Sequence, residues 1–412
     1  MNELSVDIER IKSDILELAK IGYHEQDRGI YRMAFTDEDM EGKRWLLHRI
    51  EETGLTAASD GAANISGILE GKSDSPRIFV GSHIDTVPCA GMLDGTLGVV
   101  VGLECLRALR AANADLQRTI ELIAFSDEEG RFGGTFGSEA FTGLLNLEKV
   151  RSAADLNGIP LQNAMQEHGL DPMKSLEARR VPEEIDSYLE LHIEQGPILD
   201  ENHQQVGIVE SITGLQSWSL RFDGVTNHAG TTPMDYRKDA FMGLADFAHE
   251  VPRILEENGG ENSRATIGNA EILPGAPNSV PGAVEFSLDF RDPSPEVLEE
   301  LSNAFQKALS AISRRRSLKF EFHVQGEIRP VASDERLTGI LTDEADRLGL
   351  RYRTMLSGAA HDAQLVGRIA PMAMIFVPSR GGLSHSPEEW TPWEDIEAGA
   401  NLMLAALYKL AC

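Results

Sequence analysis

The chain has 412 residues, of which 42% are hydrophobic and 25% are charged, as in a soluble globular protein that is long enough for two domains. Its 66 acidic residues outnumber its 38 basic residues, and the resulting net charge of −28 repels phosphate backbones, which argues against nucleic acid as a partner. Its three cysteines form no disulfide framework, its start lacks an apolar signal segment and no apolar run is long enough to span a bilayer, so we expect a cytoplasmic protein without a membrane partner.

The first half of the chain alternates helical and strand patterns. Amphipathic helices are predicted at residues 5–22 and 36–54, the second between a Thr36 cap and a stop at Gly54. A helix rich in small residues is predicted at residues 94–112. Apolar strands that run into polar loops are predicted at residues 77–85, 118–130, 188–196 and 371–385. This alternation predicts an α/β fold with a mainly parallel sheet, which binds ligands at the carboxyl ends of its strands.

Residues 214–324 follow a different order. Strand, helix, two strands, helix and strand are predicted in turn at residues 216–224, 239–259, 264–273, 282–292, 294–316 and 317–324. This βαββαβ order is typical of a ferredoxin-like α+β domain. Because candidate site residues lie on both sides of this segment, we expect it to be inserted into a discontinuous metal-binding catalytic domain of residues 1–213 and 325–412. A free strand edge of the insert favours pairing with a second copy, so we expect a homodimer.

Five potential metal ligands are scattered along the chain. They are His83, Asp94, Glu129, His192 and His385. Histidine and carboxylate ligands of this mix suit Zn²⁺, Mn²⁺ or Co²⁺. A pair of such ions needs a bridging carboxylate, which we expect at Asp94, where a helix N-terminus tempers the charge. The set predicts a two-metal hydrolase.

Acidic residues beside the ligands are expected to support catalysis. Asp85 follows His83 by two residues and is expected to accept a hydrogen bond from the far imidazole nitrogen. Glu128 adjoins Glu129 without being needed as a ligand, so it is free to act as a general base. Asp127, next to them, is expected to be a solvated residue of an acidic turn.

Each candidate also has an ordinary structural explanation. Asp94 alone would suit a helix N-cap, and acidic residues after a strand are usually solvated. A lone histidine such as His192 is more often a satisfied structural residue than a ligand, and the glycines before His385 also suit a simple turn. We prefer the metal site because these residues occur together at the ends of predicted strands.

The inserted segment adds three polar candidates. His228 lies in a loop after a strand, where it would donate to a developing oxyanion, and Arg291 ends a strand, where it would grip a carboxylate. Asn278 lies in a loop rich in proline and glycine. Spacing alone does not select these residues, and each by itself is typical of surface or turn chemistry.

The motifs together resemble those of the hydantoinase/carbamoylase branch of the M20 metallopeptidase-like amidohydrolases. They follow the family's order across nearly the whole chain: GSHIDTV, LDG, DEEG with RF, ELHIEQG, NHAGTTPM, an asparagine loop, DFRD, SGAAHDA and SHSPEE. GSHIDTV and DEEG mark the wider clan, whereas HIEQG and HAGTTPM are specific to this branch.

The resemblance implies the five ligands named above, with Asp94 as the bridge, Glu128 as the general base and Asp85 as a supporting partner. It also implies substrate contacts from Gln195, His228, Asn278 and Arg291, with Gln216 and the backbone at Ser357 and Gly358 as weaker candidates. His361 and Asp362 belong to a family motif and are assigned a structural role first. The implied cofactor is two divalent ions per subunit, Mn²⁺ or Zn²⁺, with Co²⁺ or Ni²⁺ as other options.

The resemblance further implies a homodimer whose inserted domain, residues 214–324, serves as lid and dimerisation domain. The implied reaction cleaves a carbamoyl or ureido C–N bond, with an N-carbamoyl-L-amino acid giving the L-amino acid, ammonia and carbon dioxide. Allantoate or ureidoglycolate hydrolysis is the near alternative, and an N-acyl amino acid amidase or dipeptidase is a more distant one. The rival of another class is a non-catalytic, metal-dependent binding protein, against which the retention of all five ligands and Glu128 argues.

Two departures from the family pattern leave the exact substrate open. Cys89, Ala90 and Gly91 stand where relatives carry Asn-Gly-Gly, and the segment RFGGTFGS at residues 131–138 looks shorter than in carbamoylases and allantoate enzymes. Both features are expected to border the substrate pocket.

Overall fold

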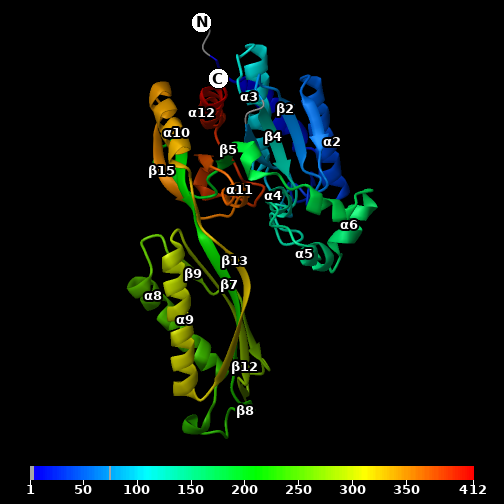
Figure 1. The fold of residues 1–412 in the computed structure, drawn as a ribbon. Helices are drawn as coiled ribbons and strands as arrows, with labels where there is room; N and C mark the ends of the chain where they lie inside the picture. The colour runs from blue at the N-terminus through cyan, green and yellow to red at the C-terminus, as the bar shows by residue number, and fades with distance from the viewer. Residues whose placement is uncertain (1–3, 74–75) are drawn as a thin grey trace. The chain divides into compact units, whose positions relative to one another are not determined.

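The structure is a computed structural model that describes residues 4–73 and 76–412 (Figure 1). These residues form two compact units. The first unit contains the described residues up to Glu210 together with Ala332–Cys412, and the second unit is Ser211–Val331. Residues 1–3 and 74–75 of the predicted catalytic domain lie outside the described ranges. Within those ranges we find no helix with the length and apolarity that a membrane crossing requires.

A nine-stranded mixed sheet forms the centre of the first unit. Its strands are β1 (Thr56–Ser59), β2 (Ile65–Leu69), β3 (Arg77–His83), β4 (Ile120–Phe125), β5 (Ile185–Ile193), β6 (Val206–Ile212), β14 (Val331–Ala332), β15 (Tyr352–Ser357) and β16 (Met372–Val377). Their order is β1, β2, β4, β3, β5, β16, β6 and β14, and β15 also pairs with β6. The neighbours β4, β3, β5 and β16 are parallel, whereas the pairs β1–β2, β2–β4 and β16–β6 are antiparallel.

The prediction of a mainly parallel sheet is therefore right only for the centre of the sheet. Residues 60–64 join β1 to β2, and so short a connection permits a hairpin but not the crossover of about a dozen residues that parallel strands need. The apolar pattern of a strand reports its burial and not its direction, so the flanking strands were not predictable from that pattern.

The first unit also contains ten α-helices among its described residues. They are α1 (Ile8–Leu18), α2 (Asp37–Glu52), α3 (Thr96–Ala111), α4 (Phe136–Thr142), α5 (Leu147–Ser152), α6 (Leu161–Glu167), α7 (Ile198–Glu201), α10 (Glu335–Leu348), α11 (Asp362–Val366) and α12 (Trp393–Ala411). The predicted cap of α2 is confirmed, because the Thr36 hydroxyl accepts from the Asp39 N–H. α3 is buried along almost its whole length and packs against β3, β4, β5 and α12, as its apolar sequence requires.

Along the chain, the second unit has the element order ββαββββαβ. Its longer elements follow the predicted βαββαβ order, and two strands of two residues each are added. Its strands are β7 (Gly214–Asp223), β8 (Asn227–His228), β9 (Arg264–Thr266), β10 (Ala270–Leu273), β11 (Ser279–Val280), β12 (Ala283–Asp292) and β13 (Lys319–Ile328), and its helices are α8 (Ala240–Asn258) and α9 (Pro295–Arg316). The main sheet has the order β10, β12, β7 and β13, with antiparallel pairs. The single strand predicted at residues 264–273 is divided into β9 and β10. Alternate residues of β7 and β12, such as Trp218 and Phe290, form the core with α8 and α9.

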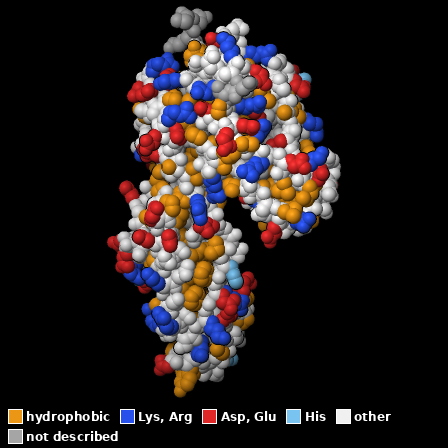
Figure 2. Space-filling model, viewed as in Figure 1, with side chains coloured by type: hydrophobic (Ala, Val, Ile, Leu, Met, Phe, Trp, Pro, Cys, Tyr) orange, Lys and Arg blue, Asp and Glu red, His pale blue; other side chains and the backbone are white. Residues whose placement is uncertain are grey.

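Charged side chains of both signs lie on the face of the molecule that is visible in Figure 2. Figure 2 shows acidic and basic side chains interspersed among apolar ones on the visible face.

Candidate metal centre

The predicted ligands converge at one edge of the first unit's sheet. His83 is the last residue of β3, and His192 lies at the end of β5, its neighbour in the sheet. Glu129 follows β4, and His385 follows β16. Because the parallel strands β4, β3, β5 and β16 end at the same edge, residues that are far apart in the sequence meet there.

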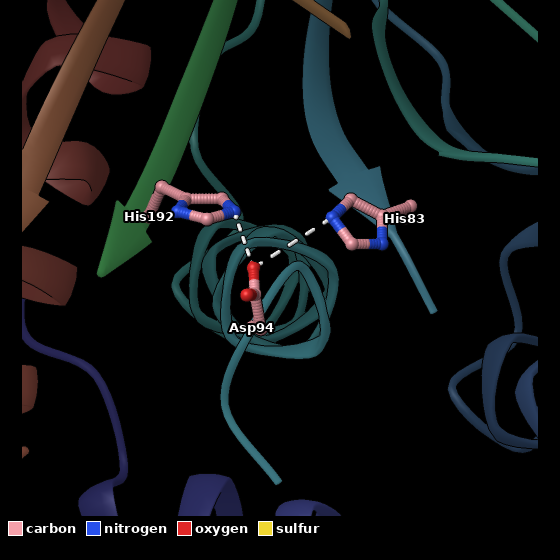
Figure 3. A group of neighbouring side chains, drawn as sticks. All are labelled: His83, Asp94 and His192. Atoms are coloured by element: carbon pink, nitrogen blue, oxygen red, sulfur yellow. Dashed lines mark ion pairs between the residues drawn. The ribbon is translucent and has the colours of Figure 1, made fainter. Parts of the chain in front are cut away.

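Two imidazoles face each other with Asp94 between them. Figure 3 shows His83 and His192 pointing toward the Asp94 carboxylate from two neighbouring strands. Asp94 Oδ1 lies 3.1 Å from His192 Nε2 and 3.9 Å from His83 Nε2. One ligand atom from each of these three buried residues falls within 4.8 Å of the others, a spacing that suits one divalent ion.

Asp94 also belongs to a second group of three. Its other oxygen, Oδ2, lies 3.3 Å from His385 Nε2, and that nitrogen is 3.4 Å from Glu129 Oε2. Asp94, Glu129 and His385 again offer ligand atoms within 4.8 Å of one another. A carboxylate that gives one oxygen to each of two groups has the arrangement of a bridge between two ions.

The position of Asp94 depends on its neighbour Gly95. Gly95 has φ +62°, and a Cβ atom at this position would lie 2.3 Å from the His83 ring. Gly95 is also the residue at the N-cap of α3, which makes no side-chain cap, so the explanation of Asp94 as a mere N-cap is wrong. Gln195 Nε2 and the Ser384 hydroxyl donate to Asp94 Oδ2 at 2.8 and 3.0 Å.

The backbone orients both imidazoles. The Nδ1 atoms of His83 and His192 pair with the carbonyl oxygens of Asp85 and Ile193 at 3.0 and 2.8 Å. An Nδ1–H that donates to a carbonyl leaves the Nε2 lone pair for a metal ion. Both Nε2 atoms accordingly face Asp94.

The predicted hydrogen bond from His83 to the Asp85 carboxylate is wrong in its acceptor. The carboxylate oxygen lies 3.9 Å from His83 Nδ1, beyond hydrogen-bond distance, and the carbonyl of the same residue takes its place. The Asp85 carboxylate instead accepts from the backbone N–H groups of Glu128 and Glu129, at 3.4 and 3.2 Å. Asp85 thus fixes the loop that presents these two glutamates.

Glu128 lies beside the first group without belonging to it. Its Oε2 is 3.6 Å from His83 Nε2, and its side chain is 10% exposed. Burial, followed by the neighbouring Asp362 and Glu129 carboxylates, raises the pKa of Glu128 well above its usual range. A carboxyl group next to the ligands but outside both groups of three suits a proton carrier.

The residues present fit a pair of divalent cations. Burial and the neighbouring Asp94 carboxylate raise the pKa of Glu129, and Glu129 Oε1 is buried without a hydrogen-bond partner. Although burial opposes it, contact with Asp94 raises the pKa of His192 to about 9. The carboxylates of Asp94, Glu129, Glu128 and Asp85 are thus buried close together. Bound cations would offset the repulsion between them and would pair with the buried Glu129 oxygen.

Asp127 differs from the prediction of a solvated turn residue. It is fully buried, and both of its carboxylate oxygens accept from the Phe132 N–H, at 3.2 and 3.1 Å. Burial raises the pKa of Asp127 well above its usual range. The carboxylate folds the loop after β4 back on itself, which a local sequence pattern of acids could not indicate.

A supporting group that sequence reasoning missed lies behind His192. Glu190, two residues earlier on β5, accepts from Ser82 Oγ at 2.8 Å and from Tyr188 Oη at 3.0 Å. The period of two in a strand places Glu190 and His192 on one face, a signal that would have found Glu190. The His361 ring packs edge-on against His192 with centroids 4.6 Å apart, which suits its predicted structural role.

Gln195 contacts the candidate centre, and Gly358 lies in the same unit. Gln195 Nε2 donates to Asp94 Oδ2, whereas Gln195 Oε1 is buried and has no hydrogen-bond partner among the described residues. Gly358 lies in the loop after β15, next to Ser357, whose hydroxyl pairs with His361 Nε2 at 3.0 Å.

The other predicted substrate contacts lie in the second unit. His228 on β8 pairs with Ser279 on β11, and the Ala229 N–H donates to the Asn278 carbonyl at 2.9 Å, so His228 and Asn278 are neighbours. The His228 Nδ1 accepts from the Gly230 N–H at 3.1 Å.

Arg291 and Gln216 occupy opposite faces of the second unit's sheet. Arg291 Nε donates to Asp289 Oδ1 at 2.9 Å on the face away from the core. Gln216 lies opposite Phe290, and its Oε1 accepts from Trp218 Nε1 at 3.1 Å on the core side. The two side chains therefore do not form one cluster.

The profile of Peptidase family M20/M25/M40 matches residues 79–409 of the chain. The chain is 34% identical to the N-carbamoyl-L-amino-acid amidohydrolase of Pseudomonas sp. (strain NS671), over 99% of this chain and 100% of that protein. It is also 34% identical to the allantoate amidohydrolase of Bacillus subtilis (strain 168), over 100% of both chains. The crystal structure of an amidase of the hydantoinase/carbamoylase family from Burkholderia multivorans superposes with a TM-score of 0.89 at 33% identity, over 99% of each chain. These similarities confirm the resemblance seen in the motifs: the chain belongs to peptidase family M20/M25/M40, in its hydantoinase/carbamoylase branch.

Proposed function

We propose that this protein hydrolyses a carbamoyl or ureido C–N bond with the help of two divalent ions. The preferred substrate is an N-carbamoyl-L-amino acid, which with one water molecule gives the L-amino acid, ammonia and carbon dioxide. The observation that carries the proposal is the Asp94 carboxylate, which is shared between two groups of three potential ligands, with Glu128 beside them. The similarity over full length to the Pseudomonas N-carbamoyl-L-amino-acid amidohydrolase supports this substrate class.

The chain's own residues would hold the ions and move the proton. His83, His192, Glu129 and His385 would each hold one ion, and Asp94 would be shared by both. Two divalent ions, Mn²⁺ or Zn²⁺, would supply Lewis acidity to the scissile carbonyl and lower the pKa of water. Glu128 accepts the proton of the attacking water molecule and delivers it to the leaving nitrogen.

His228 would donate to the oxygen of the scissile carbonyl. Its Nδ1 accepts from the Gly230 N–H, so the neutral ring carries its proton on Nε2. A donor of this kind stabilises the negative charge that develops on the oxygen in the transition state. Asn278, the neighbour of His228, would contact the same part of the substrate.

Arg291 would bind the substrate carboxylate through its planar guanidinium. We expect Arg291→Lys to raise KM by about tenfold or more, because losing one charge-assisted hydrogen bond costs about 1.5–3 kcal/mol. Arg221→Lys is the matched control, since Arg221 lies on the neighbouring strand β7, is 37% exposed against 36% for Arg291, and also pairs through Nε with an aspartate two residues away at 2.9 Å. Steady-state kinetics check the result. Equal KM values for both variants and the parent would show that Arg291 is structural.

Allantoate is the second candidate substrate. The Bacillus subtilis allantoate amidohydrolase is as similar as the Pseudomonas enzyme, at 34% identity. Cys89 and Ala90, which stand where relatives carry Asn-Gly, lie in the loop that leads to Asp94.

Ammonia release from a panel of substrates tests the proposal. The panel contains N-carbamoyl-L-amino acids, allantoate, ureidoglycolate and N-acyl amino acids, each supplied with Mn²⁺ or Zn²⁺. We expect the highest kcat/KM for an N-carbamoyl-L-amino acid. Turnover of N-acyl amino acids alone would replace the proposed class with an acylase, and no turnover with bound metal would favour a binding protein.

A further inference from the structure

Glu389 connects two segments that carry candidate metal ligands. It lies in the loop after β16, the loop that also contains His385, and it is 4% exposed. Its Oε1 accepts from the backbone N–H groups of Leu93 and Asp94, at 2.8 and 3.0 Å. One carboxylate oxygen thus holds the main chain of the bridging residue from a position almost three hundred residues later in the sequence.

The same loop also touches the side chain of Asp94. The Ser384 hydroxyl lies 3.0 Å from Asp94 Oδ2 and 3.4 Å from Glu389 Oε2. Ser384 is the residue before His385, so one short stretch of chain contacts both the backbone and the carboxylate of Asp94. This stretch, which also carries His385, therefore fixes both the main chain and the carboxylate of Asp94.

Gly91 makes room for the Glu389 side chain. A Cβ atom at Gly91 would lie 2.5 Å from Glu389 Cβ and 2.6 Å from Glu389 Oε1. Both distances are shorter than any ordinary contact, so a larger residue at position 91 would displace Glu389 or the loop that precedes Asp94.

The loop that carries Glu389 is itself anchored. The Arg380 N–H donates to the Trp390 carbonyl at 2.9 Å, and the Thr391 hydroxyl donates to the Pro378 carbonyl at 2.7 Å. These bonds close the loop at its base, directly beside Glu389. A fixed base lets the carboxylate act as a rigid support and not as a mobile side chain.

We propose that Glu389 is a positioning residue that holds Asp94 against His385 and thereby sets the affinity of the ion position formed by Asp94, Glu129 and His385. The inference rests on the proposed function, because it assumes that these residues bind an ion. Groups that hold metal ligands in place affect affinity, since an ion requires its ligand atoms at defined distances. The His83 and His192 imidazoles are held by other bonds, to Asp85 and Ile193, so the first ion position depends less on Glu389.

The test is a titration of the metal-free chain with Mn²⁺ alone, in which free Mn²⁺ is followed by electron paramagnetic resonance. We expect the parent to bind two ions. Glu389→Ala should bind the ion of the Asp94, Glu129 and His385 group about 10- to 100-fold more weakly, the usual effect of losing a supporting hydrogen bond behind a ligand. The other ion should lose less affinity, because His83 and His192 are held by bonds of their own. Glu389→Gln should recover most of the affinity, because its amide oxygen still accepts from Leu93 and Asp94.

Glu388→Ala is the matched control, because Glu388 is the exposed neighbour of Glu389 and its hydrogen bonds among the described residues are to Ser386 in its own turn. It should bind both ions as the parent does. Gly91→Ala is an independent perturbation, which should produce the same selective loss by pushing Glu389 away. Circular dichroism and thermal melting establish that each variant is folded.

If Glu389→Ala and Gly91→Ala each bind both ions with the affinities of the parent, the positioning role is overturned and the proposed function stays intact. If Glu389→Ala does not fold, the titration of Gly91→Ala decides the question. A parent that binds fewer than two ions overturns the two-ion centre, and with it the role of Glu389.

Discussion

Replacing Glu128 with glutamine lowers kcat by about 100-fold or more, while the chain keeps both ions and its fold. The amide has almost the same shape as the carboxylate but cannot accept the proton of the attacking water. Glu128 belongs to neither group of three ligand atoms, although its Oε2 is 3.6 Å from His83 Nε2. Steady-state kinetics together with metal analysis of the purified variant check this result.

Glu129→Gln is the control for the Glu128 variant, since the two residues are adjacent and only Glu129 lies in a group of potential ligands. We expect Glu129→Gln to weaken metal binding, with a loss of activity that excess Mn²⁺ partly restores. If Glu128→Gln loses metal and Glu129→Gln keeps it, the two roles have been exchanged.

Replacing Asp94 with asparagine weakens both ion positions at once and abolishes activity. Asp94 gives Oδ1 to the group with His83 and His192, and Oδ2 to the group with Glu129 and His385. Asparagine keeps the size of the side chain but removes the charge that a bridge between two cations needs. Calorimetric titration with Mn²⁺ should show both sites weakened.

His385→Ala provides the contrast to Asp94→Asn. His385 belongs to one group only and is 50% exposed, so its loss should weaken one ion position and leave the other. An Asp94→Asn variant that still binds one ion with the affinity of the parent would contradict the bridging role.

The sequence predicted the elements that carry the candidate site because their local signals are strong. The Thr36 cap of α2 and the apolar strands that end at His83 and His192 are present close to the predicted positions. The carboxyl ends of parallel strands lie at the same edge of a sheet. The convergence of candidate ligands that follow such strands was therefore predictable as well.

The remaining features depend on contacts that no local pattern encodes. The direction of β1, β2 and β6 follows from connections and packing, and not from strand periodicity. His83 Nδ1 lies 3.0 Å from the Asp85 carbonyl oxygen and 3.9 Å from its carboxylate, and no sequence pattern distinguishes two acceptors of the same residue. Asp127 has the sequence context of a solvated turn, yet it is buried because the loop after β4 folds back onto it.

The role of Glu389 could not be predicted either, because its partners are far from it in the sequence. Its motif, SHSPEE, is evident in the sequence, but its partners Leu93 and Asp94 lie in a segment near the start of α3. Only the fold reveals that one of two adjacent glutamates is buried against a ligand segment while the other faces solvent.

The central claim, a two-ion hydrolysis of a carbamoyl C–N bond, is tested most directly by one titration. Ammonia release from an N-carbamoyl-L-amino acid is measured while the exhaustively demetallated chain receives increasing equivalents of Mn²⁺. The account predicts no release without metal and a plateau at two ions per chain, as the sharing of Asp94 between two groups requires. Full activity of the demetallated chain, or a plateau at one ion per chain, would contradict it.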